Sequence, residues 1–533
     1  MPSSSGLRAL VVGALAVVLA AGCTGPEPGE PDLRGAPHTL RVLGSSELAD
    51  MRPILDEARQ ATGVSVELTG IGSVEGTELL RSGHADGRYD ATWFASDRYV
   101  SLYPEARDRR GDSTKIMSSP VLLGLRASTA AELGWDRAAP SWLDIAEAAE
   151  QRRFSFGMTN PAKSNSGMSA LVGIATALAD TGSALDVDQA RRALPELRGF
   201  FAGQTLTSGS SGWLSQSYQR RGSAAGEPVD GLVNYESVLL SMNASGDLDE
   251  RLVPIHPRDG VATADYPLTL LRSASDEARS AYQRLTDYLR LPRVQQRIME
   301  LTHRRPITAQ VELTPELRDH PMFELPFPAR PAVVDELLLA YFDQLRRPTR
   351  TLYVLDTSGS MRGDRLSALK DALGSLTGAG ETSRFDRFHN REQVTLLPFN
   401  STAGPAATFD IPERDPGPVL ADIRAHGERL GASGETALYD ALLAAFALAA
   451  EQGAADPDRF TSIVLMTDGE NNRGRSLAEF TAAPRPPVPV FPILFGEGNV
   501  EEMRAVADAT GGKVFDARAQ SLTRVFAEVR GYQ

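Results

Sequence analysis

A five-residue loop constrains what this chain can fold into more than any other feature of its sequence. The motif Asp-Thr-Ser-Gly-Ser at 356–360 follows the apolar run 352–355 and precedes a helical pattern with leucines on one face. Such a loop belongs at the carboxyl end of a buried strand, where open α/β sheets bind ligands. It carries one carboxylate, Asp356, and two hydroxyls, Ser358 and Ser360. These hard oxygen donors suit Mg²⁺ and leave the ion able to accept one more anionic oxygen, from an Asp or Glu of a partner.

Two later segments complete a recognisable pattern. Thr436 opens an apolar helix, and Asp468 follows the apolar strand-like run 463–467. Asp-x-Ser-x-Ser after a strand, followed by a Thr on a second loop and an Asp on a third, resembles the metal-ion-dependent adhesion site of von Willebrand factor A domains. The resemblance covers residues 346–533. It implies a doubly wound, Rossmann-like α/β domain that holds Mg²⁺, or Mn²⁺ or Ca²⁺, through five residues: Asp356, Ser358, Ser360, Thr436 and Asp468.

A simpler interpretation of the same loop remains open. Asp and Ser residues before a helix often form an Asx or Ser turn that caps the helix, with no metal involved. Under the metal interpretation, by contrast, the resemblance implies a protein partner that presents a carboxylate to the bound ion.

Composition excludes several classes of function. The chain has 533 residues with 55 Lys and Arg against 69 Asp and Glu, a net charge of −14. Nucleic acids and anionic lipids are bound by basic surfaces, so neither is expected as a partner. The seven histidines are scattered, and no phosphate-binding Gly-x-x-x-x-Gly-Lys-Ser/Thr motif occurs. We therefore expect a binding protein and no enzyme.

The amino-terminal segment resembles a bacterial lipoprotein signal. Arg8 precedes an apolar stretch over 9–21 that is too short to span a bilayer, and Cys23, the only cysteine, follows directly after Gly22. The resemblance implies cleavage of residues 1–22 and lipidation of Cys23, followed by a Pro/Gly-rich tether over 23–37. The protein would then be exported and held at the extracytoplasmic face of the cell membrane by this lipid alone. An ordinary signal peptide with a chance cysteine is the alternative.

Residues 38–325 alternate between strand-like and helical patterns, which predicts mostly parallel sheets. A Ser-rich loop at 44–46, a Pro…Ser-Asn-Ser-Gly segment at 161–167 and Tyr-Glu-Ser at 235–237 resemble, in this order, the two-lobed extracellular solute-binding proteins of bacterial uptake systems, type II. The resemblance implies a small polar or anionic solute in the cleft between lobes. Candidate cleft residues are Ser45, Ser46, Ser96, Ser119, Ser166 and Tyr235. Helix caps and turns explain each serine equally well, and Tyr235 also fits a structural role.

Two segments outside these regions carry further expectations. The Pro-rich stretch that begins the segment 326–345 is expected to join the two regions, followed by an amphipathic connecting helix. The charged segment 381–393, interrupted by Phe385 and Phe388, is expected to be a surface excursion that contacts a partner.

Three functions are consistent with these patterns. The first is a membrane-anchored binding protein whose A domain grips an acidic residue of a protein partner through Mg²⁺, in adhesion, assembly or sensing at the cell surface. The alternative is a solute-binding lipoprotein of a transport system, with the A domain as a docking or regulatory appendage. The third is a scaffold for inserting metal into another complex, and the export signal argues against it.

Overall fold

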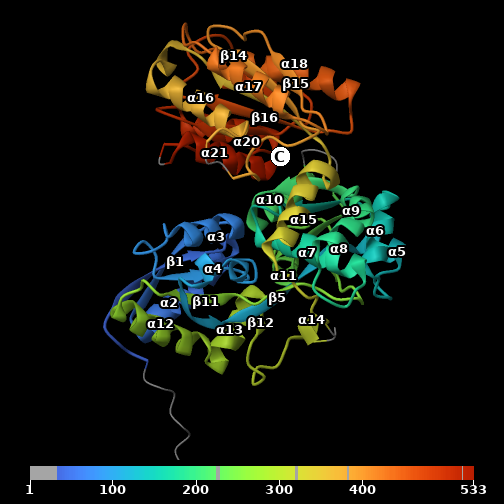
Figure 1. Ribbon diagram of the computed structural model, residues 1–533, viewed down its shortest axis with the longest axis vertical. Coiled ribbons are helices and arrows are strands. Elements are labelled where there is room, and N and C mark those ends of the chain that lie inside the picture. Colours follow the sequence, from blue (N-terminus) through green and yellow to red (C-terminus); the bar gives the residue numbers. More distant parts are fainter. Residues whose placement is uncertain (1–32, 224–228, 319–321, 381–382, 519) are drawn as a thin grey trace, which may run out of the picture.

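The computed structural model describes residues 33–223, 229–318, 322–380, 383–518 and 520–533. These residues form two lobes that lie next to each other and a third body that lies across them (Figure 1). Each body is built around one sheet. Cys23 and the segments on either side of it fall outside the described residues, so the lipidation site is a prediction from sequence alone.

The first lobe contains a five-stranded mixed sheet in the order β2-β1-β3-β11-β4. Strand β1 pairs in parallel with β2 and β3, whereas β11 is antiparallel to β3 and β4. Its strands are β1 (His38–Gly44), β2 (Val64–Gly70), β3 (Ala91–Trp93), β4 (Arg110–Lys115) and β11 (Pro267–Leu271). Its helices are η1 (Ser46–Met51), α2 (Arg52–Thr62), α3 (Ser73–Ser82), η2 (Val100–Leu102), α4 (Pro104–Arg107), α12 (Asp276–Leu289) and α13 (Pro292–Thr302).

The chain enters the second lobe at β5, returns to the first at β11, and passes to the second lobe again at β12. The second sheet has the order β10-β5-β8-β6-β7, with β9 and β12 also paired to β5. Its strands are β5 (Met117–Arg126), β6 (Phe156–Thr159), β7 (Gln204–Ser208), β8 (Gly231–Tyr235), β9 (Leu252–Ile255), β10 (Thr263–Ala264) and β12 (Arg305–Pro306). Its helices are α5 (Ala127–Leu133), α6 (Trp142–Glu150), α7 (Asn165–Ala179), α8 (Val187–Arg192), α9 (Leu194–Phe201), α10 (Ser211–Ser223) and α11 (Glu236–Ser245), and α14 (Pro315–Arg318) follows β12.

The third body has a six-stranded sheet in the order β15-β14-β13-β16-β17-β18, parallel except for β15. Its core lies on both faces because side chains alternate along a strand: Leu352 and Val354 face one layer of helices, Tyr353 and Leu355 the other. The strands are β13 (Thr349–Asp356), β14 (Gln393–Phe399), β15 (Ala407–Asp410), β16 (Phe460–Thr467), β17 (Val490–Leu494) and β18 (Phe515–Asp516). One face carries α16 (Asp364–Leu376), α17 (Gly417–Glu428) and α21 (Leu522–Val529); the other carries α18 (Leu438–Ala455), α19 (Leu477–Ala482) and α20 (Val500–Thr510). The expected doubly wound α/β fold is confirmed.

The connecting segment is packed into the second lobe. Helix α15 (Pro331–Ala340) continues into a short π turn, η3 (Tyr341–Leu345), and buries apolar side chains against α7, α8 and α9. Tyr341 meets Phe201 edge to face, with 5.3 Å between ring centroids. The third body is therefore attached to the second lobe by a continuous apolar core and not by a free linker.

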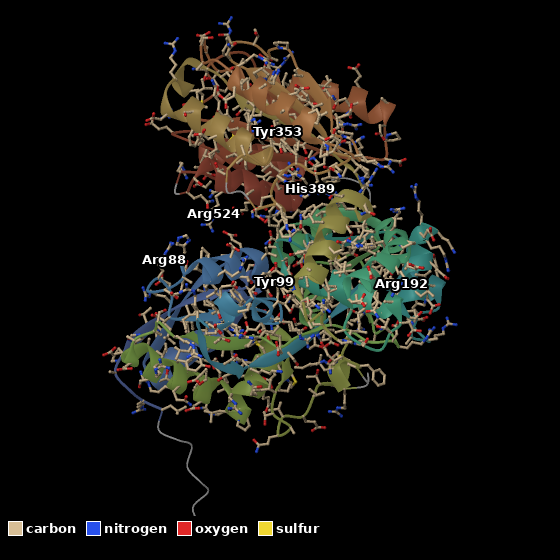
Figure 2. The ribbon with its side chains drawn as sticks, viewed as in Figure 1. Arg88, Tyr99, Arg192, Tyr353, His389 and Arg524 are labelled. Atoms are coloured by element: carbon tan, nitrogen blue, oxygen red, sulfur yellow. The ribbon has the colours of Figure 1, made fainter. Side chains whose placement is uncertain are left out.

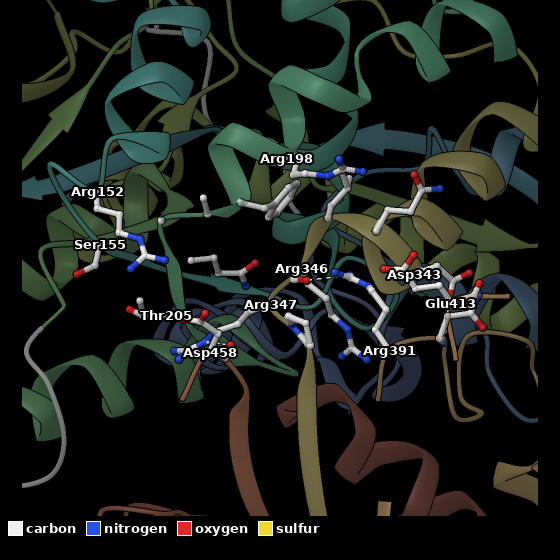
Figure 3. Close-up of a pocket in the computed structure, with 18 of the residues that line it drawn as sticks. Arg152, Ser155, Arg198, Thr205, Asp343, Arg346, Arg347, Arg391, Glu413 and Asp458 are labelled. Carbon is white, nitrogen blue, oxygen red and sulfur yellow. Dashed lines mark hydrogen bonds between the residues drawn. The ribbon is translucent and has the colours of Figure 1, made fainter. Parts of the chain in front are cut away.

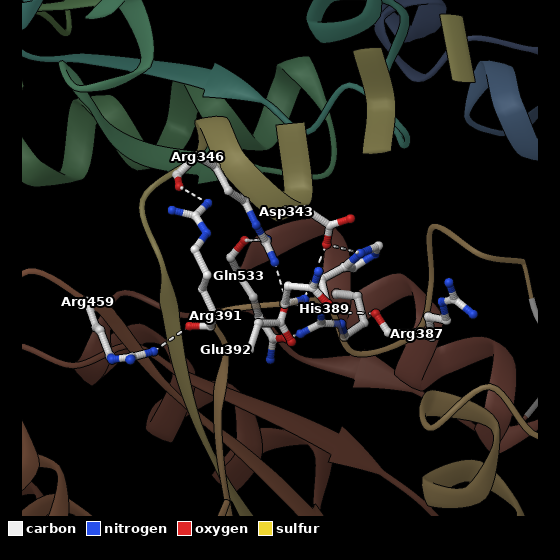
Figure 4. A network of polar contacts seen from close by, with 10 residues as sticks. Asp343, Arg346, Arg387, His389, Arg391, Glu392, Arg459 and Gln533 are labelled. Carbon is white, nitrogen blue, oxygen red and sulfur yellow. Dashed lines mark hydrogen bonds and ion pairs between the residues drawn. The ribbon is translucent and has the colours of Figure 1, made fainter. Parts of the chain in front are cut away.

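A buried ionic network closes the base of the third body (Figure 4). The carboxylate of Glu392 accepts from both Arg346, at the end of the connecting segment, and Arg530, near the carboxyl terminus. Gln533 joins the same cluster, because its backbone oxygen accepts from Arg346 at 3.1 Å and its side-chain oxygen from Arg530 at 2.7 Å. Burial alone raises the pKa of Glu392, but the charges of Arg530 and Arg346 outweigh burial and lower it.

The segment after α16 differs from its expectation. Within the part that the structure describes, residues 383–393 are packed between the bodies and do not form a surface excursion. Phe385 and Phe388 are buried, and His389 stacks on Phe342 with 4.2 Å between ring centroids. Its charges led to the wrong expectation, because tertiary contacts satisfy them: Asp386 binds Lys163 of the second lobe at 2.5 Å.

Candidate metal centre and solute cleft

Asp356 ends the central strand β13 and is fully buried. Its Oδ1 accepts the backbone N–H of Ser358 at 2.8 Å, and its Oδ2 accepts the hydroxyl of Thr467 at 2.8 Å. The loop turns back on itself here because this local hydrogen bond competes with further strand extension. Both carboxylate oxygens are therefore held in fixed positions at the carboxyl edge of the sheet.

The two serines link this carboxylate to the third loop. The hydroxyls of Ser358 and Ser360 lie 3.0 Å apart, and the Ser360 hydroxyl donates to Oδ1 of Asp468 at 2.8 Å. Asp468 and Ser358 are buried, whereas Ser360 is exposed. Four of the five expected ligands thus form one connected group that opens to solvent on the side of Ser360.

Thr436 belongs to a loop docked against the first one. The N–H of Gly359 donates to the carbonyl of Gly434 at 2.9 Å, and the N–H of Thr436 donates to the side chain of Asn472 at 2.8 Å. Gly434 has φ of +83°, and an added Cβ would lie 2.7 Å from the Ser401 hydroxyl, so a glycine is required at this turn. Thr436 is buried beside the group, and its side chain forms no hydrogen bond to the other four residues within the described structure.

Three supporting residues were not identified from the sequence. Arg365, in the first turn of α16, binds Oδ2 of Asp468 at 2.6 Å. Thr467 holds Asp356, and Asn472 holds the loop of Thr436. The pair Asn471-Asn472 directly after the Asp468 turn was a usable signal, whereas nothing in the sequence distinguishes Arg365 from other helix arginines.

The chemistry of the donor set fits a divalent cation. Burial raises the pKa of Asp356; hydrogen bonds from Ser358 and Thr467 oppose this, and the charge of Asp468 adds to it. Two buried carboxylates face one cation, Arg365, so the group carries unbalanced negative charge. The described residues contain no group of three or more His, Cys, Asp or Glu side chains that could hold a metal by themselves. A metal here depends on hydroxyl oxygens for most of its protein ligands, as Mg²⁺ accepts.

A separate cavity of about 710 Å³ lies where the three bodies meet. The first lobe contributes the loop after β1 and the start of α3, and the second lobe contributes the segment before α7. The third body covers them with the start of the 383–393 segment and with α21. Arg524, at this junction in Figure 2, binds Glu75 of the first lobe at 2.6 Å, while Asp386 binds Lys163 of the second. The third body therefore contacts both lobes beside the cavity.

The cleft residues expected from sequence divide into two groups. Ser45 and Ser46 line the cavity. The structure does not place Ser96, Ser119, Ser166 or Tyr235 in its lining. Their hydroxyls bond within the protein: Ser96 caps Arg98, Ser119 accepts from Ser237, Ser166 bonds Thr159 and Ser211, and Tyr235 accepts from Asn165.

Glu47 is the cavity residue that sequence reasoning missed. It lines the cavity, yet its Oε1 is buried and has no hydrogen-bond partner in the described structure. Burial raises its pKa, with the charge of nearby Arg304 opposing. Arg304 is itself buried, bonded to Asp50 at 2.6 Å and stacked over the Tyr266 ring at 4.9 Å from its centroid. Glu47 is thus a cavity-lining carboxyl group whose Oε1 is buried beside Tyr235 and Arg304.

Comparisons with known proteins identify both regions. Residues 40–300 match the family model described as bacterial extracellular solute-binding protein, and residues 351–470 match the model of the von Willebrand factor type A domain. The chain therefore combines a solute-binding-protein-like, two-lobed region with a carboxyl-terminal von Willebrand factor A domain. The resemblances of these two regions are confirmed, whereas the lipoprotein signal stays a prediction. No curated protein matches the chain.

Two solved structures are similar to a little more than half of the chain. The periplasmic binding protein AfuA from Actinobacillus pleuropneumoniae, with fructose-6-phosphate bound, is 12% identical with a TM-score of 0.43, covering 58% of this chain and 98% of its own. The iron-bound HitA from Pseudomonas aeruginosa is 16% identical with a TM-score of 0.40, covering 56% and 96%. Within the described residues, no helix is both long and apolar enough to cross a membrane.

Proposed function

We propose that this protein is an exported binding protein, anchored through lipid on Cys23, whose A domain holds Mg²⁺ and engages an acidic residue of a protein partner. The observation that carries the proposal is the connected group of Asp356, Ser358, Ser360 and Asp468, closed on the inside and open at Ser360. Binding is the activity that we propose for this group, because its carboxylate and hydroxyl oxygens form a donor set that suits a divalent cation.

The position of the group supports recognition of a partner outside the chain. Strand β13 starts at Thr349, next to the second lobe, and ends at Asp356. At about 3.3 Å per residue, the strand separates the two edges by roughly 23 Å. Along the sheet, Tyr353 lies further from the lobes than His389 does (Figure 2). The metal group therefore lies at the edge away from the lobes, where a second protein has access.

If bound there, Mg²⁺ would be held directly by Ser358, Ser360 and Thr436, with Asp356 and Asp468 as direct or water-bridged ligands. The ion would supply the positive charge that a partner carboxylate requires. Thr467 fixes the orientation of Asp356, and Arg365 keeps one oxygen of Asp468 occupied, so that Asp468 offers its other oxygen.

The first test is titration of the full mature chain with Mg²⁺ by calorimetry, in comparison with Asp356→Ala and with Asp371→Ala. Asp371 is an exposed carboxylate on α16 and serves as the matched control. We expect binding by wild type and by Asp371→Ala and none by Asp356→Ala. Equal binding by all three chains would contradict the metal site.

The second test identifies the partner. The same three chains serve as bait for a surface extract of the producing cell, with Mg²⁺ and with EDTA. We expect one protein to be retained by wild type and Asp371→Ala in Mg²⁺ only. Retention that is insensitive to EDTA and to Asp356→Ala would show that recognition does not pass through the metal. For the anchor, Cys23→Ser is expected to move the protein from the membrane fraction to the medium or periplasm.

Solute capture is the second candidate, and Glu47 favours it. Glu47 lines the cavity together with Ser45 and Ser46, and a wall of hydroxyl and carboxyl side chains suits a polar solute. A thermal-shift screen of polar solutes tests this with wild type, Glu47→Gln and the exposed control Glu105→Gln. A solute that stabilises wild type and the control but binds Glu47→Gln about tenfold more weakly would support it. A screen without any such solute counts against this function.

A further inference from the structure

A second cavity, lined by arginines, lies between the second lobe and the A domain (Figure 3). It has a volume of about 1170 Å³ and is separate from both the metal group and the cleft between the lobes. The second lobe contributes its residues near α9 and β7, and the A domain those near the starts of β13 and β14. We call it the arginine groove. Six arginines line it: Arg152, Arg198, Arg346, Arg347, Arg391 and Arg414.

These arginines have too few anionic partners. Of the six, and within the described residues, only Arg346 forms an ion pair, with Glu392. Arg347 donates to the backbone oxygens of Pro457 and Asp458 at 2.6 and 2.5 Å, and Arg391 donates to the backbone oxygen of Arg346 at 3.0 Å. A neutral carbonyl satisfies hydrogen bonding but does not neutralise charge. The side chains of the remaining three have no hydrogen-bond or ion-pair partner among the described residues: Arg152, Arg198 and Arg414.

Four carboxylates also line the groove, but none of them pairs with a lining arginine in the described structure. Asp230 accepts from Ser155 at 2.7 and 2.9 Å, and Asp343 accepts from His389 and from the N–H of Asn390. Asp458 and Glu413 are exposed at its rim. Six arginines and four carboxylates line the groove, and the Arg346 charge is compensated by Glu392, so the groove keeps an excess of positive charge on a chain whose net charge is −14.

The protein maintains this charge excess at a cost. Burial lowers the pKa of Arg391, and the charges of Arg346 and Arg198 lower it further. Arg391 also leaves a buried Nε without a hydrogen-bond partner in the described residues.

We propose that the arginine groove binds the phosphate group of a small ligand, either inorganic phosphate or a phosphate monoester. A phosphate monoester carries about −1.5 to −2 charge near neutral pH, so the excess positive charge of the groove attracts it. Guanidinium groups bind phosphate oxygens through paired, charge-assisted hydrogen bonds. The volume of the groove exceeds what phosphate alone occupies and leaves room for an organic substituent. The site does not depend on the metal centre or on the cleft between the lobes.

The test uses residues whose loss does not threaten the fold. Arg152 and Arg198 belong to the second lobe and are exposed, and their removal leaves no described partner without its hydrogen bond. The double variant Arg152→Ala/Arg198→Ala is therefore expected to fold normally. Arg192→Ala, on α8 and also exposed, removes an arginine outside the groove and is the matched control. Before binding is measured, circular dichroism and thermal unfolding are used to check that the three chains are equally folded.

Binding of inorganic phosphate and of glycerol 3-phosphate is measured by calorimetry on the full mature chain at constant ionic strength. We expect wild type and Arg192→Ala to bind at least one of them, and the double variant to bind about tenfold or more weakly. Tighter binding of glycerol 3-phosphate identifies an organic phosphate, and equal or tighter binding of inorganic phosphate identifies the free ion. Absence of binding by wild type, or equal binding by wild type and the double variant, would overturn the proposal.

Discussion

The two edges of the A-domain sheet present opposite chemistry. At the carboxyl edge, Asp356 and Asp468 place buried negative charge beside hydroxyls, with Arg365 as their only described cation. At the amino edge, Arg346 and Arg391 face a groove with excess positive charge. One sheet thus places buried negative charge at one edge and excess positive charge at the other, as the proposed cation and anion sites require. The difference follows the direction of the strands, because the amino ends of the strands pack on the second lobe.

The largest expected effect comes from removing the buried carboxylate at the amino edge of the sheet. Glu392→Ala leaves Arg346 and Arg530 buried without their carboxylate, and removal of one partner of a buried ionic group costs about 3–5 kcal/mol in the free energy of unfolding. Chemical denaturation of the full chain measures it. Glu413→Ala, exposed at the groove, is the control and is expected to stay within about 0.5 kcal/mol of wild type. If Glu392→Ala lowers the free energy of unfolding by less than about 1 kcal/mol, water must solvate the two arginines in place of the carboxylate.

The next effect tests the carboxyl edge. With Mg²⁺ at a hundred times its dissociation constant, wild type is expected to gain about 2.7 kcal/mol in the free energy of unfolding. Asp356→Ala is expected to gain nothing, and Asp371→Ala to gain as much as wild type. Denaturation curves with Mg²⁺ and with EDTA provide the measurement. The prediction concerns only the increment on adding metal, because loss of Asp356 also changes the metal-free stability.

Acid is expected to weaken the amino edge less than the Glu392→Ala substitution does, because the protonated side chain stays in place. The folded state lowers the pKa of Glu392 below the unfolded value of about 4.5. Its charge therefore stabilises the fold fully above that value, and this contribution is lost as the pH falls through the lower folded pKa. Below pH ~4.5, the free energy of unfolding of Glu392→Gln is expected to fall less steeply with pH than that of wild type, because Gln has no charge to lose. Identical acid profiles for wild type and Glu392→Gln would rule out this contribution.

A smaller effect distinguishes the contacts of the A domain with the two lobes. Lys163 and Asp386 are 17% and 18% exposed, and their coupling in a double-mutant cycle is expected to be about 1 kcal/mol. Glu75 and Arg524 are 44% and 55% exposed, so their coupling is expected to be a few tenths of a kcal/mol and to fall further with salt. Equal couplings would indicate that the A domain holds both lobes alike; the expected inequality indicates that it is fixed to the second lobe and only touches the first.

Prediction from sequence succeeded for the fold, because the doubly wound arrangement follows from the local alternation of strands and helices. The loop of Asp356, Ser358 and Ser360 was located at the end of the central strand in the same way, and its binding of a metal stays a prediction. The cleft was predicted less well. Ser45 and Ser46 were found, but Glu47, the next residue along, was missed, because only tertiary packing buries one of its oxygens at the cavity.

The sequence by itself determined the strand and helix periods, the carboxyl-edge loops and the two families, because those depend on residue spacing within single segments. Only the tertiary structure decided that Phe385, Phe388 and His389 are buried between bodies, that α21 covers the cleft, and that distant arginines share one groove. The physical reason is that burial and net charge at a site depend on which distant segments pack together. No pattern within one segment of this chain specifies how its two regions meet.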